Sequence, residues 1–216
     1  MTSIGKPSIL VLGGGVGGVV AAGELRKRLK DEARVVLVER NPLQSFPPSY
    51  LWVMTGERKP GAITRDITRL ERKGIEVVAG VAQGIDLARR SVAVDGREIA
   101  YDYLVVALGV ELVPETVPGL PQAHTFYDLP GAERLREALR AFGGGRVAVV
   151  VAGMPYKCPA APYEGAMLLE AYFHKRHVRH KVELAMYTPD PAPLPVAGPG
   201  AGEAVEELLA HKGIGF

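Results

Sequence analysis

Cysteine, long apolar runs and an excess of charge of one sign are all scarce in this 216-residue sequence. The single cysteine, Cys158, excludes a disulfide framework within the chain and fits a reducing compartment. No stretch reaches the ~18 apolar residues of a membrane span. The first fifteen residues lack the basic, apolar and small-residue order of a signal peptide. The sequence therefore predicts a cytoplasmic protein.

The charge is nearly balanced, with 26 Lys and Arg against 24 Asp and Glu and a net charge of +2. Because the basic residues are spread along the chain, this balance favours neither nucleic acid nor an anionic membrane as a partner. Hydrophobic residues make up 47% and charged residues 23%, as in ordinary globular proteins. The length leaves room for one or two domains of roughly 100–200 residues each.

Two short apolar runs at residues 8–12 and 34–39 are typical of buried parallel strands, and a helix is expected over 16–30 between them. Together they predict a βαβ unit. The patterns then predict a loop, a helix, a strand, an alternating hairpin and another buried strand, at residues 41–60, 63–73, 75–80, 85–101 and 103–109. The hairpin turns at Asp95-Gly96, a favourable hairpin dipeptide.

A second strand, helix and strand series follows from residue 146. The expected elements are a helix, a strand, a helix, a strand, a loop and a helix, at residues 130–142, 146–153, 163–175, 182–187, 188–202 and 203–212. The predicted fold class is α/β, with two Rossmann-like dinucleotide-binding units of a flavoprotein fold, in domains 1–112 and 113–216. Both units are expected to be truncated at the C-terminus, because the chain stops after a helix that should lead into another strand.

A glycine turn follows the first strand. Gly13, Gly15 and Gly18 give the spacing G-x-G-x-x-G between strand and helix, which suits a tight turn, a pyrophosphate against the backbone and close helix packing. Glu39 ends the second strand, 21 residues after Gly18, where its carboxylate can accept from ribose hydroxyls and repel a 2′-phosphate. The turn therefore predicts dinucleotide binding and disfavours NADP. The motif alone leaves FAD and NAD open.

The order of elements after Glu39 resembles the FAD domain of flavoprotein reductases with two dinucleotide domains. In that resemblance the strand ending in Ala107 and Gly109 lies near the FAD, and the backbone at Val81 meets the adenine. Arg40, next to Glu39, is assigned with these cofactor-binding residues.

The cysteine lies on a proline-rich turn, MPYKCPAAPYEGA, between a predicted strand and helix. A thiolate near a helix start and beside Lys157 can act as a nucleophile. This turn lacks the G-x-G-x-x-G of an NADH domain, so Cys158 occupies the place where dinucleotide phosphates would otherwise lie. The alternative is a buried and inert thiol.

Together with SFPPSYLWVMTGERKPGAI, which contains the only tryptophan, Trp52, the cysteine turn resembles the sulfide:quinone oxidoreductase and flavocytochrome c sulfide dehydrogenase family. The resemblance covers about the first half of the family pattern. It implies an FAD cofactor whose flavin has the Trp52 loop on one side and Cys158 on the other. It also implies oxidation of sulfide or a small sulfur compound through a persulfide or disulfide at Cys158, with a quinone or cytochrome as electron acceptor. For Trp52 the alternative is packing as a loop anchor.

The sequence departs from that pattern in two places. The quinone-reducing branch often carries a further cysteine in the region matched by residues 124–132, and this chain has none there. Flavocytochrome-type members attach FAD through a cysteine in the region matched by residues 41–46. This chain has no cysteine there, so covalent attachment of the flavin is excluded. Peripheral membrane contact through a C-terminal half and a homodimer are further expectations from the resemblance.

Two further groups of titratable residues have competing interpretations. Glu164 is a candidate proton acceptor for HS⁻ or a persulfide if burial makes it a stronger base; the alternative is a first-turn Glu that suits the helix dipole. His174, His177 and His180 suggest a metal site, but cations lie beside them and repel a metal ion. We therefore expect a basic helix end and no metal.

Two other functions stay open. A type II NADH dehydrogenase-like flavin reductase has the same architecture, and the missing second glycine turn argues against it. A truncated, non-catalytic flavoprotein module is the alternative that is not an enzyme.

Overall fold

The computed structural model describes residues 5–216, and the chain divides into two compact units. The first unit runs up to Phe46 and continues over Gly61–Leu112, and the second contains Pro47–Pro60 and Val113–Phe216. The segment Pro47–Pro60 thus packs with the later part of the chain. The domain bounds 1–112 and 113–216 stay a prediction. The predicted absence of a signal peptide rests partly on residues 1–4, which lie outside the described residues.

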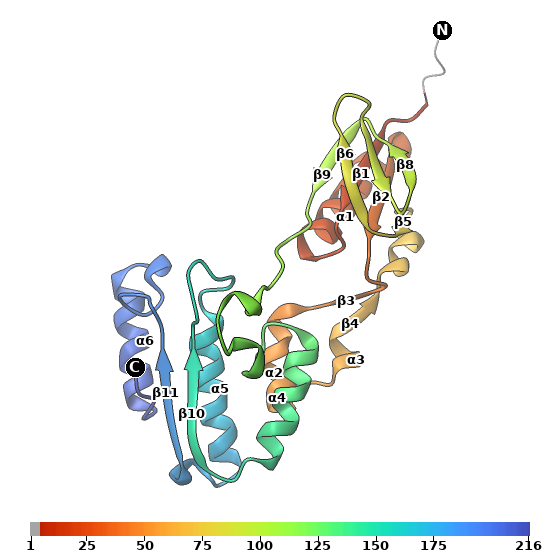
Figure 1. Ribbon diagram of the computed structural model, residues 1–216. Helices are drawn as coiled ribbons and strands as arrows, with labels where there is room; N and C mark the ends of the chain where they lie inside the picture. The colour runs from red at the N-terminus through yellow and green to blue at the C-terminus, as the bar shows by residue number, and fades with distance from the viewer. Residues whose placement is uncertain (1–4) are drawn as a thin grey trace. The chain divides into compact units, whose positions relative to one another are not determined.

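Four parallel strands form the main sheet of the first unit, in the order β5-β2-β1-β9. Their bounds are Ser8–Leu12 for β1, Arg34–Glu39 for β2, Glu76–Ala79 for β5 and Tyr103–Val106 for β9. Helix α1, Val16–Leu29, connects β1 to β2 (Figure 1). The predicted βαβ unit and its parallel sheet are confirmed.

Both faces of this sheet are covered by other elements. Successive side chains of each strand point to opposite faces and therefore pack in two different core clusters. Leu10 and Val36 pack with Val92 in one core cluster, on the side of an antiparallel three-stranded sheet. Val11 and Leu37 pack on the other face with residues of α1 and of the 3-10 helix Ile67–Lys73. The strands of the antiparallel sheet are β6, Ala82–Asp86, β7, Ser91–Val94, and β8, Arg97–Ala100. The β7–β8 hairpin turns at the predicted Asp95-Gly96.

The long loop expected over residues 41–60 is wrong, because this segment contains regular structure. Strand β3, Leu43–Ser45, pairs antiparallel with β4, Thr64–Asp66. Two helices lie between them, α2 over Tyr50–Thr55 and α3 over Pro60–Ile63. Helix α2 buries most of its side chains and packs against two helices of the second unit, α4 and α5. Such tertiary contacts leave no local periodicity in a six-residue helix.

The helix expected over residues 63–73 is also corrected. Its first residues belong to α3 and β4, and the remainder is the 3-10 helix Ile67–Lys73. The carboxylate of Asp66 accepts hydrogen bonds from the backbone N–H of Thr68 at 2.8 Å and from its hydroxyl at 2.6 Å. Asp66 therefore starts the helix and ends the preceding strand.

The second unit contains a two-stranded parallel sheet and its helices (Figure 1). The elements are α4, Leu129–Ala141, β10, Gly145–Val150, α5, Ala161–Lys175, β11, Val182–Tyr187, and α6, Pro199–His211. Helix α6 begins four residues before its predicted start, because a proline is tolerated in the first turn. Gly215 donates to Leu184 O at 2.9 Å and accepts from Met186 N at 2.7 Å, so the residues after α6 run parallel beside β11.

Among residues 5–216 the structure has five further 3-10 helices besides Ile67–Lys73 and Pro47–Ser49. They are Lys30–Glu32, Pro114–Thr116, Leu120–Gln122, Arg179–Lys181 and Pro195–Ala197. Within residues 5–216 no helix combines the length and the apolar character needed to cross a bilayer.

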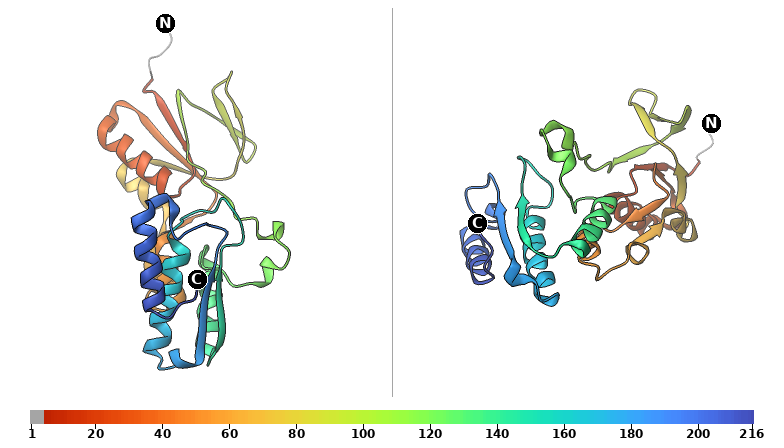
Figure 2. Two further views of the ribbon diagram at one scale, coloured as in Figure 1. Left: turned by 90° about the vertical axis from the view of Figure 1, so that its left-hand side faces the viewer. Right: turned by 60° about the horizontal axis from the view of Figure 1, so that its bottom comes forward.

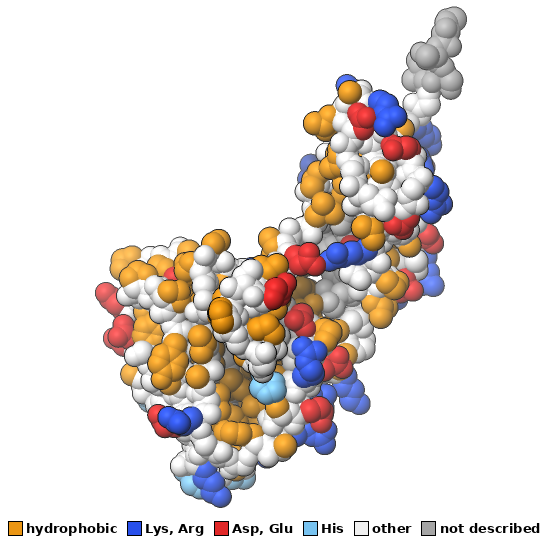
Figure 3. All heavy atoms as spheres, in the orientation of Figure 1, with side chains coloured by type: hydrophobic (Ala, Val, Ile, Leu, Met, Phe, Trp, Pro, Cys, Tyr) orange, Lys and Arg blue, Asp and Glu red, His pale blue; other side chains and the backbone are white. Residues whose placement is uncertain are grey.

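Helices α5 and α6 lie on the same side of β10 and β11 (Figure 2). Right-handed crossovers that add strands in one direction place their helices on one face of a sheet. The other face is left without a helix among the described residues, and Val150 and Tyr187, paired in register, are 58% and 60% exposed. Hydrophobic side chains gather over β10 and β11 on this face (Figure 3).

The core of the first unit gives a stability prediction. Leu10 is fully buried between the layers, so Leu10→Ala is expected to lower the free energy of unfolding by about 2–5 kcal/mol. Leu87 is 76% exposed, and Leu87→Ala should change it by no more than about 0.5 kcal/mol. Urea denaturation followed by circular dichroism measures both. Equal effects of the two substitutions contradict the assignment of this core.

Candidate functional site

The carboxyl ends of three parallel strands meet at one edge of the first sheet. Gly13 follows β1, Glu39 ends β2 and Ala107 follows β9. The N–H of Gly13 donates to Val38 O at 2.8 Å, and the N–H of Ala107 donates to Leu12 O at 2.8 Å, so the strand ends are tied together. The chain leaves β1 toward β2 on one side, and β9 lies on the other. In open α/β sheets such a switch point is where ligands bind.

The three glycines of the turn meet three different requirements. Gly13 has φ of +99°, and a Cβ there would overlap the carbonyl oxygen of Ala107. A Cβ on Gly18 would overlap the carbonyl oxygen of Gly13, so α1 packs directly on the turn that precedes it. Gly15 is exposed and a Cβ there meets no atom within 4 Å. The space beside Gly15 is thus open at the start of α1, where helix N–H groups are available to an anion.

Glu39 lies across this turn. One carboxylate oxygen accepts from the backbone N–H of Gly14, and the other accepts from the N–H of Asn41 at 2.8 Å. Two backbone bonds fix the carboxylate and still leave lone pairs for ribose hydroxyls, because an ionised carboxylate can accept about four hydrogen bonds. The open helix start and the fixed acid fit the pyrophosphate and the ribose of a dinucleotide.

The other predicted cofactor-binding residues of the first unit differ in how far protein contacts already occupy them. Val81 is 46% exposed, but its N–H donates to Asp95 Oδ1 at 3.3 Å and its carbonyl accepts from Asp95 N at 3.3 Å. An adenine contact at Val81 must compete with Asp95, which the sequence analysis did not single out. Gly109 has φ of +72° in open surroundings, and Arg40 lies 4.0 Å from the carboxylate of Glu111.

Trp52 belongs to α2 in the second unit and is half-buried. The guanidinium of Arg58 lies 4.7 Å from the centroid of its ring, and the Arg58 N–H donates to Trp52 O at 3.0 Å. Arg58 also donates to the hydroxyl of Ser49 at 2.5 Å. One face of the indole is therefore covered by a cation–π contact. This arrangement favours the loop-anchor alternative, and a flavin contact of Trp52 stays a prediction.

Cys158 lies on the turn between β10 and α5 and is exposed. The alternative of a buried thiol is therefore wrong. Its φ is +56°, a region that non-glycine residues rarely adopt. The Cys158 carbonyl accepts from Ala161 N at 3.0 Å and from the Tyr127 hydroxyl at 3.4 Å. The Lys157 ammonium lies 5.9 Å from the centroid of the Tyr127 ring, so the residue before the cysteine also contacts this tyrosine.

Glu164 does not meet the condition on which its proposed role depended. It is exposed in the first turn of α5, while its neighbours Tyr163 and Gly165 are buried. The helix turns its small and aromatic residues inward and Glu164 outward, so the burial on which the proton-acceptor role depended is absent. Its position supports the helix-dipole alternative.

Two buried acids were missed by the sequence analysis. Asp190 is 9% exposed and accepts from the Tyr156 hydroxyl at 2.7 Å and from Thr188 Oγ1 at 3.1 Å. The pKa of Tyr156 is raised, mainly by burial and also by the hydrogen bond to Asp190. The Tyr156 hydroxyl therefore stays protonated and acts as a donor. The available signal was an acid shortly after a strand, but the proline-rich surroundings indicated only a loop.

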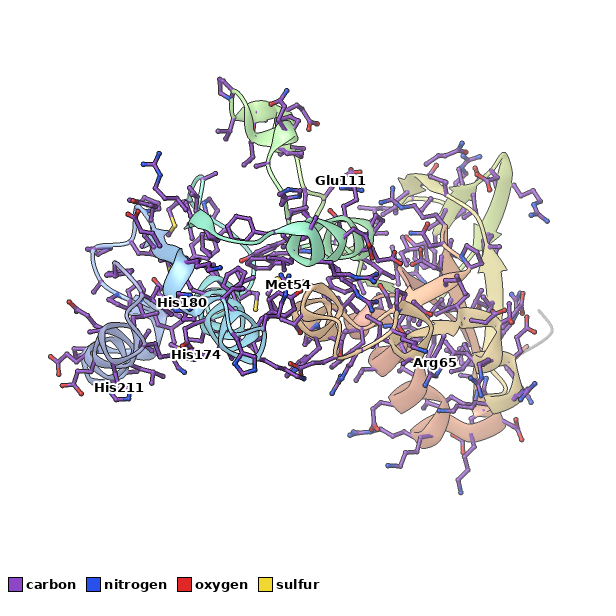
Figure 4. The ribbon with its side chains drawn as sticks, turned by 90° about the horizontal axis from the view of Figure 1, so that it is seen from below. Met54, Arg65, Glu111, His174, His180 and His211 are labelled. Carbon is purple, nitrogen blue, oxygen red and sulfur yellow. The ribbon has the colours of Figure 1, made fainter. Side chains whose placement is uncertain are left out.

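The second missed acid is Glu170, which is 5% exposed on α5. It lies 3.0 Å from His174 Nε2 and 3.2 Å from Lys212 Nζ, and it thereby connects α5 to the end of α6. His174 and His180 are on α5 and on the short helix that follows it (Figure 4). Within residues 5–216 no group of three His, Cys, Asp or Glu is arranged to hold a metal ion.

The sequence profile of the pyridine nucleotide-disulphide oxidoreductase family matches residues 7–216. The chain belongs to this family. The α/β fold and parallel sheet described above are those of a pyridine nucleotide-disulphide oxidoreductase.

The resemblance to sulfide:quinone oxidoreductases that the sequence predicts is found in curated relatives and in a solved structure. The mitochondrial sulfide:quinone oxidoreductase of Mus musculus is 29% identical over 187 residues, covering 83% of this chain and 41% of that protein. The sulfide-quinone reductase of Aquifex aeolicus is 30% identical over 212 residues, covering 95% and 49%. The crystal structure of the A. aeolicus sulfide:quinone oxidoreductase superposes with a TM-score of 0.87 at 30% identity, over 97% of this chain and 50% of that one. The predicted similarity is confirmed, and the chain spans about half the length of the curated relatives it matches.

The glycine turn gives a test that needs no cofactor. Gly18→Ala places a methyl group against the Gly13 carbonyl and is expected to destabilise the protein by about 1–3 kcal/mol or more. Gly23→Ala is the matched control in the same helix, where nothing lies within 4 Å, and it should stabilise by roughly 0.5–1 kcal/mol. Chemical denaturation of the two variants measures the difference. A Gly18→Ala variant as stable as Gly23→Ala shows that α1 does not pack on the turn.

Proposed function

We propose that this family member is an FAD-dependent oxidoreductase that oxidises sulfide or a small sulfur compound through Cys158 and passes the electrons to a quinone or cytochrome. The observation that carries the proposal is the exposed Cys158 on the turn between β10 and α5, in a chain similar to sulfide:quinone oxidoreductases. The chain covers 41% and 49% of those two relatives, so the activity of the whole relatives is a proposal for this protein.

The first unit supports FAD binding at the carboxyl edge of its sheet. The open surface at Gly15 and the start of α1 receive the pyrophosphate, and Glu39 accepts from the ribose. When bound, FAD supplies the two-electron acceptor for the oxidation of sulfur. The contacts of Arg40, Ala107 and Gly109 with FAD belong to the same proposal.

The second unit repeats the strand–helix–strand order but is poorly suited to a nicotinamide dinucleotide. Pro159 and Pro162 have no N–H to donate, and the Ala161 N–H is already bonded to Cys158 O at 3.0 Å. Glu164 adds a negative charge in the first turn, which repels phosphate. We therefore propose a Rossmann-like unit that presents a thiol where an NADH domain presents its phosphate site. This disfavours the NADH dehydrogenase alternative.

Cys158 holds the reacting sulfur in this proposal. Sulfide attacks the outer sulfur of a disulfide or persulfide at Cys158, so an S–S bond forms to the incoming sulfur while the bond to Cys158 breaks and Cys158 leaves as a thiolate. When the Cys158 thiolate forms a new S–S bond to the lengthened sulfur chain, one proton and two electrons are released, and bound FAD would supply the acceptor for these electrons. The choice of acceptor, the peripheral membrane contact, a cytoplasmic location and a homodimer stay predictions.

The flavin site is tested by Gly15→Val in the intact protein. A Cβ at this position meets no protein atom within 4 Å, so the fold should survive, but the valine side chain fills the space that the pyrophosphate needs. We expect flavin content, measured by visible absorbance after purification, to fall, and the Kd for added FAD to rise by about ten-fold or more, which corresponds to a loss of at least some 1.4 kcal/mol of binding free energy. Glu39→Ala should also reduce it. A Gly15→Val protein with the flavin content of the parent refutes this assignment, and a parent protein that binds no flavin supports a non-catalytic module.

The role of Cys158 is tested by Cys158→Ser, a nearly isosteric change. A hydroxyl cannot carry a persulfide or leave as a thiolate does, so anaerobic reduction of the flavin by sulfide should slow by orders of magnitude at unchanged FAD content. Stopped-flow absorbance at the flavin band measures the rate. Equal rates in the two proteins remove Cys158 from the mechanism. Rapid bleaching by NADH in both proteins supports the reductase alternative instead.

A further inference from the structure

The turn that carries Cys158 has a second attachment point, two residues before the cysteine. The Tyr156 hydroxyl donates to Asp190 Oδ2 at 2.7 Å, a short hydrogen bond to a buried carboxylate. Asp190 is itself held by Thr188, whose hydroxyl donates to the carboxylate at 3.1 Å and accepts from Asp190 N at 3.1 Å. The turn after β10 is thereby fastened to the loop after β11.

The attachment matters because Cys158 is held in an unfavourable backbone conformation. A non-glycine residue at φ of +56° is sterically disfavoured and persists only where its surroundings enforce it. The Cys158 carbonyl is fixed by Ala161 and Tyr127, on the helix side and on the segment before α4. The bond from Tyr156 to Asp190 fixes the other side of the cysteine. Released on that side, the turn can relax and move the thiol.

We propose that Tyr156 and Asp190 are positioning residues that hold the Cys158 thiol in the place from which it reacts. This inference rests on the proposed function of Cys158. Asp190 contacts neither the thiol nor any reacting atom, and it acts through Tyr156 and the backbone of the turn. The requirement at position 190 is an oxygen that accepts from the Tyr156 hydroxyl, and a negative charge is not needed.

Four variants separate positioning from a general structural effect. Asp190→Ala removes the acceptor, Tyr156→Phe removes the donor, and Asp190→Asn keeps an amide oxygen that can accept. Tyr172→Phe is the matched control, because it removes a tyrosine hydroxyl from the same unit on the far part of α5. In the intact protein, Asp190→Ala and Tyr156→Phe should slow the reduction of flavin by sulfide about ten-fold or more, since displacement of a reacting group by ~1 Å can cost about 100-fold. Asp190→Asn and Tyr172→Phe should stay within about two-fold of the parent, all at unchanged FAD content.

A spectroscopic measurement reports the thiol position without any turnover. The chain has one cysteine, so ¹³C-cysteine labelling of the 216-residue chain gives signals from Cys158 alone. We expect Asp190→Ala and Tyr156→Phe to shift or split the Cys158 signals, and Asp190→Asn and Tyr172→Phe to preserve them. Unshifted signals in Asp190→Ala overturn the proposal. So does a parent-like rate of flavin reduction in Asp190→Ala when Cys158→Ser has lost the reaction. If Cys158→Ser keeps the rate, the proposed function itself fails, and the positioning role falls with it.

Discussion

The missing side chain at Gly18 allows α1 to begin directly on the carbonyl oxygen of Gly13, and the rest of the first unit depends on that approach. With the helix start this close to the end of β1, its N–H groups open onto the carboxyl edge of the sheet. The same closeness brings the turn within reach of Glu39 at the end of β2, whose carboxylate accepts from Gly14. A larger residue at position 18 displaces the helix and separates the groups that fit a dinucleotide.

In both units an acidic side chain holds the turn that follows the first strand of a parallel pair, but the residues involved differ. In the first, an acid at the end of the second strand, Glu39, accepts from the turn that follows the first strand. In the second, Asp190, three residues beyond the end of β11, accepts from Tyr156 on the turn that follows β10. In each case an acid associated with one strand fixes the turn after its parallel neighbour. The first turn presents open backbone at Gly15, and the second presents a thiol at Cys158.

The sequence predicted the elements whose structure follows from local pattern. The strands Ser8–Leu12, Arg34–Glu39 and Val182–Tyr187 have the predicted bounds, because buried apolar runs between turn residues define them. Helix α2 and the pair β3–β4 were missed, since contacts between distant segments form them. At the site, glycine spacing predicted the turn, because each glycine there meets a steric demand. The burial of Asp190, the exposure of Glu164 and the contact of Arg58 with Trp52 depend on tertiary packing, which the sequence pattern does not show.

Cys158 combines an exposed thiol with a backbone that tertiary contacts hold in place. An exposed turn without tertiary attachments samples many conformations, and a thiol on it meets its partner in the reactive geometry only part of the time. Burial fixes a side chain but closes it to a small sulfur compound. In the second unit the attachment is made through Lys157 and Tyr156, one and two residues before the cysteine, and through the backbone carbonyl of Cys158 itself. The side chain of Cys158 therefore stays open to solvent while the backbone that carries it is held.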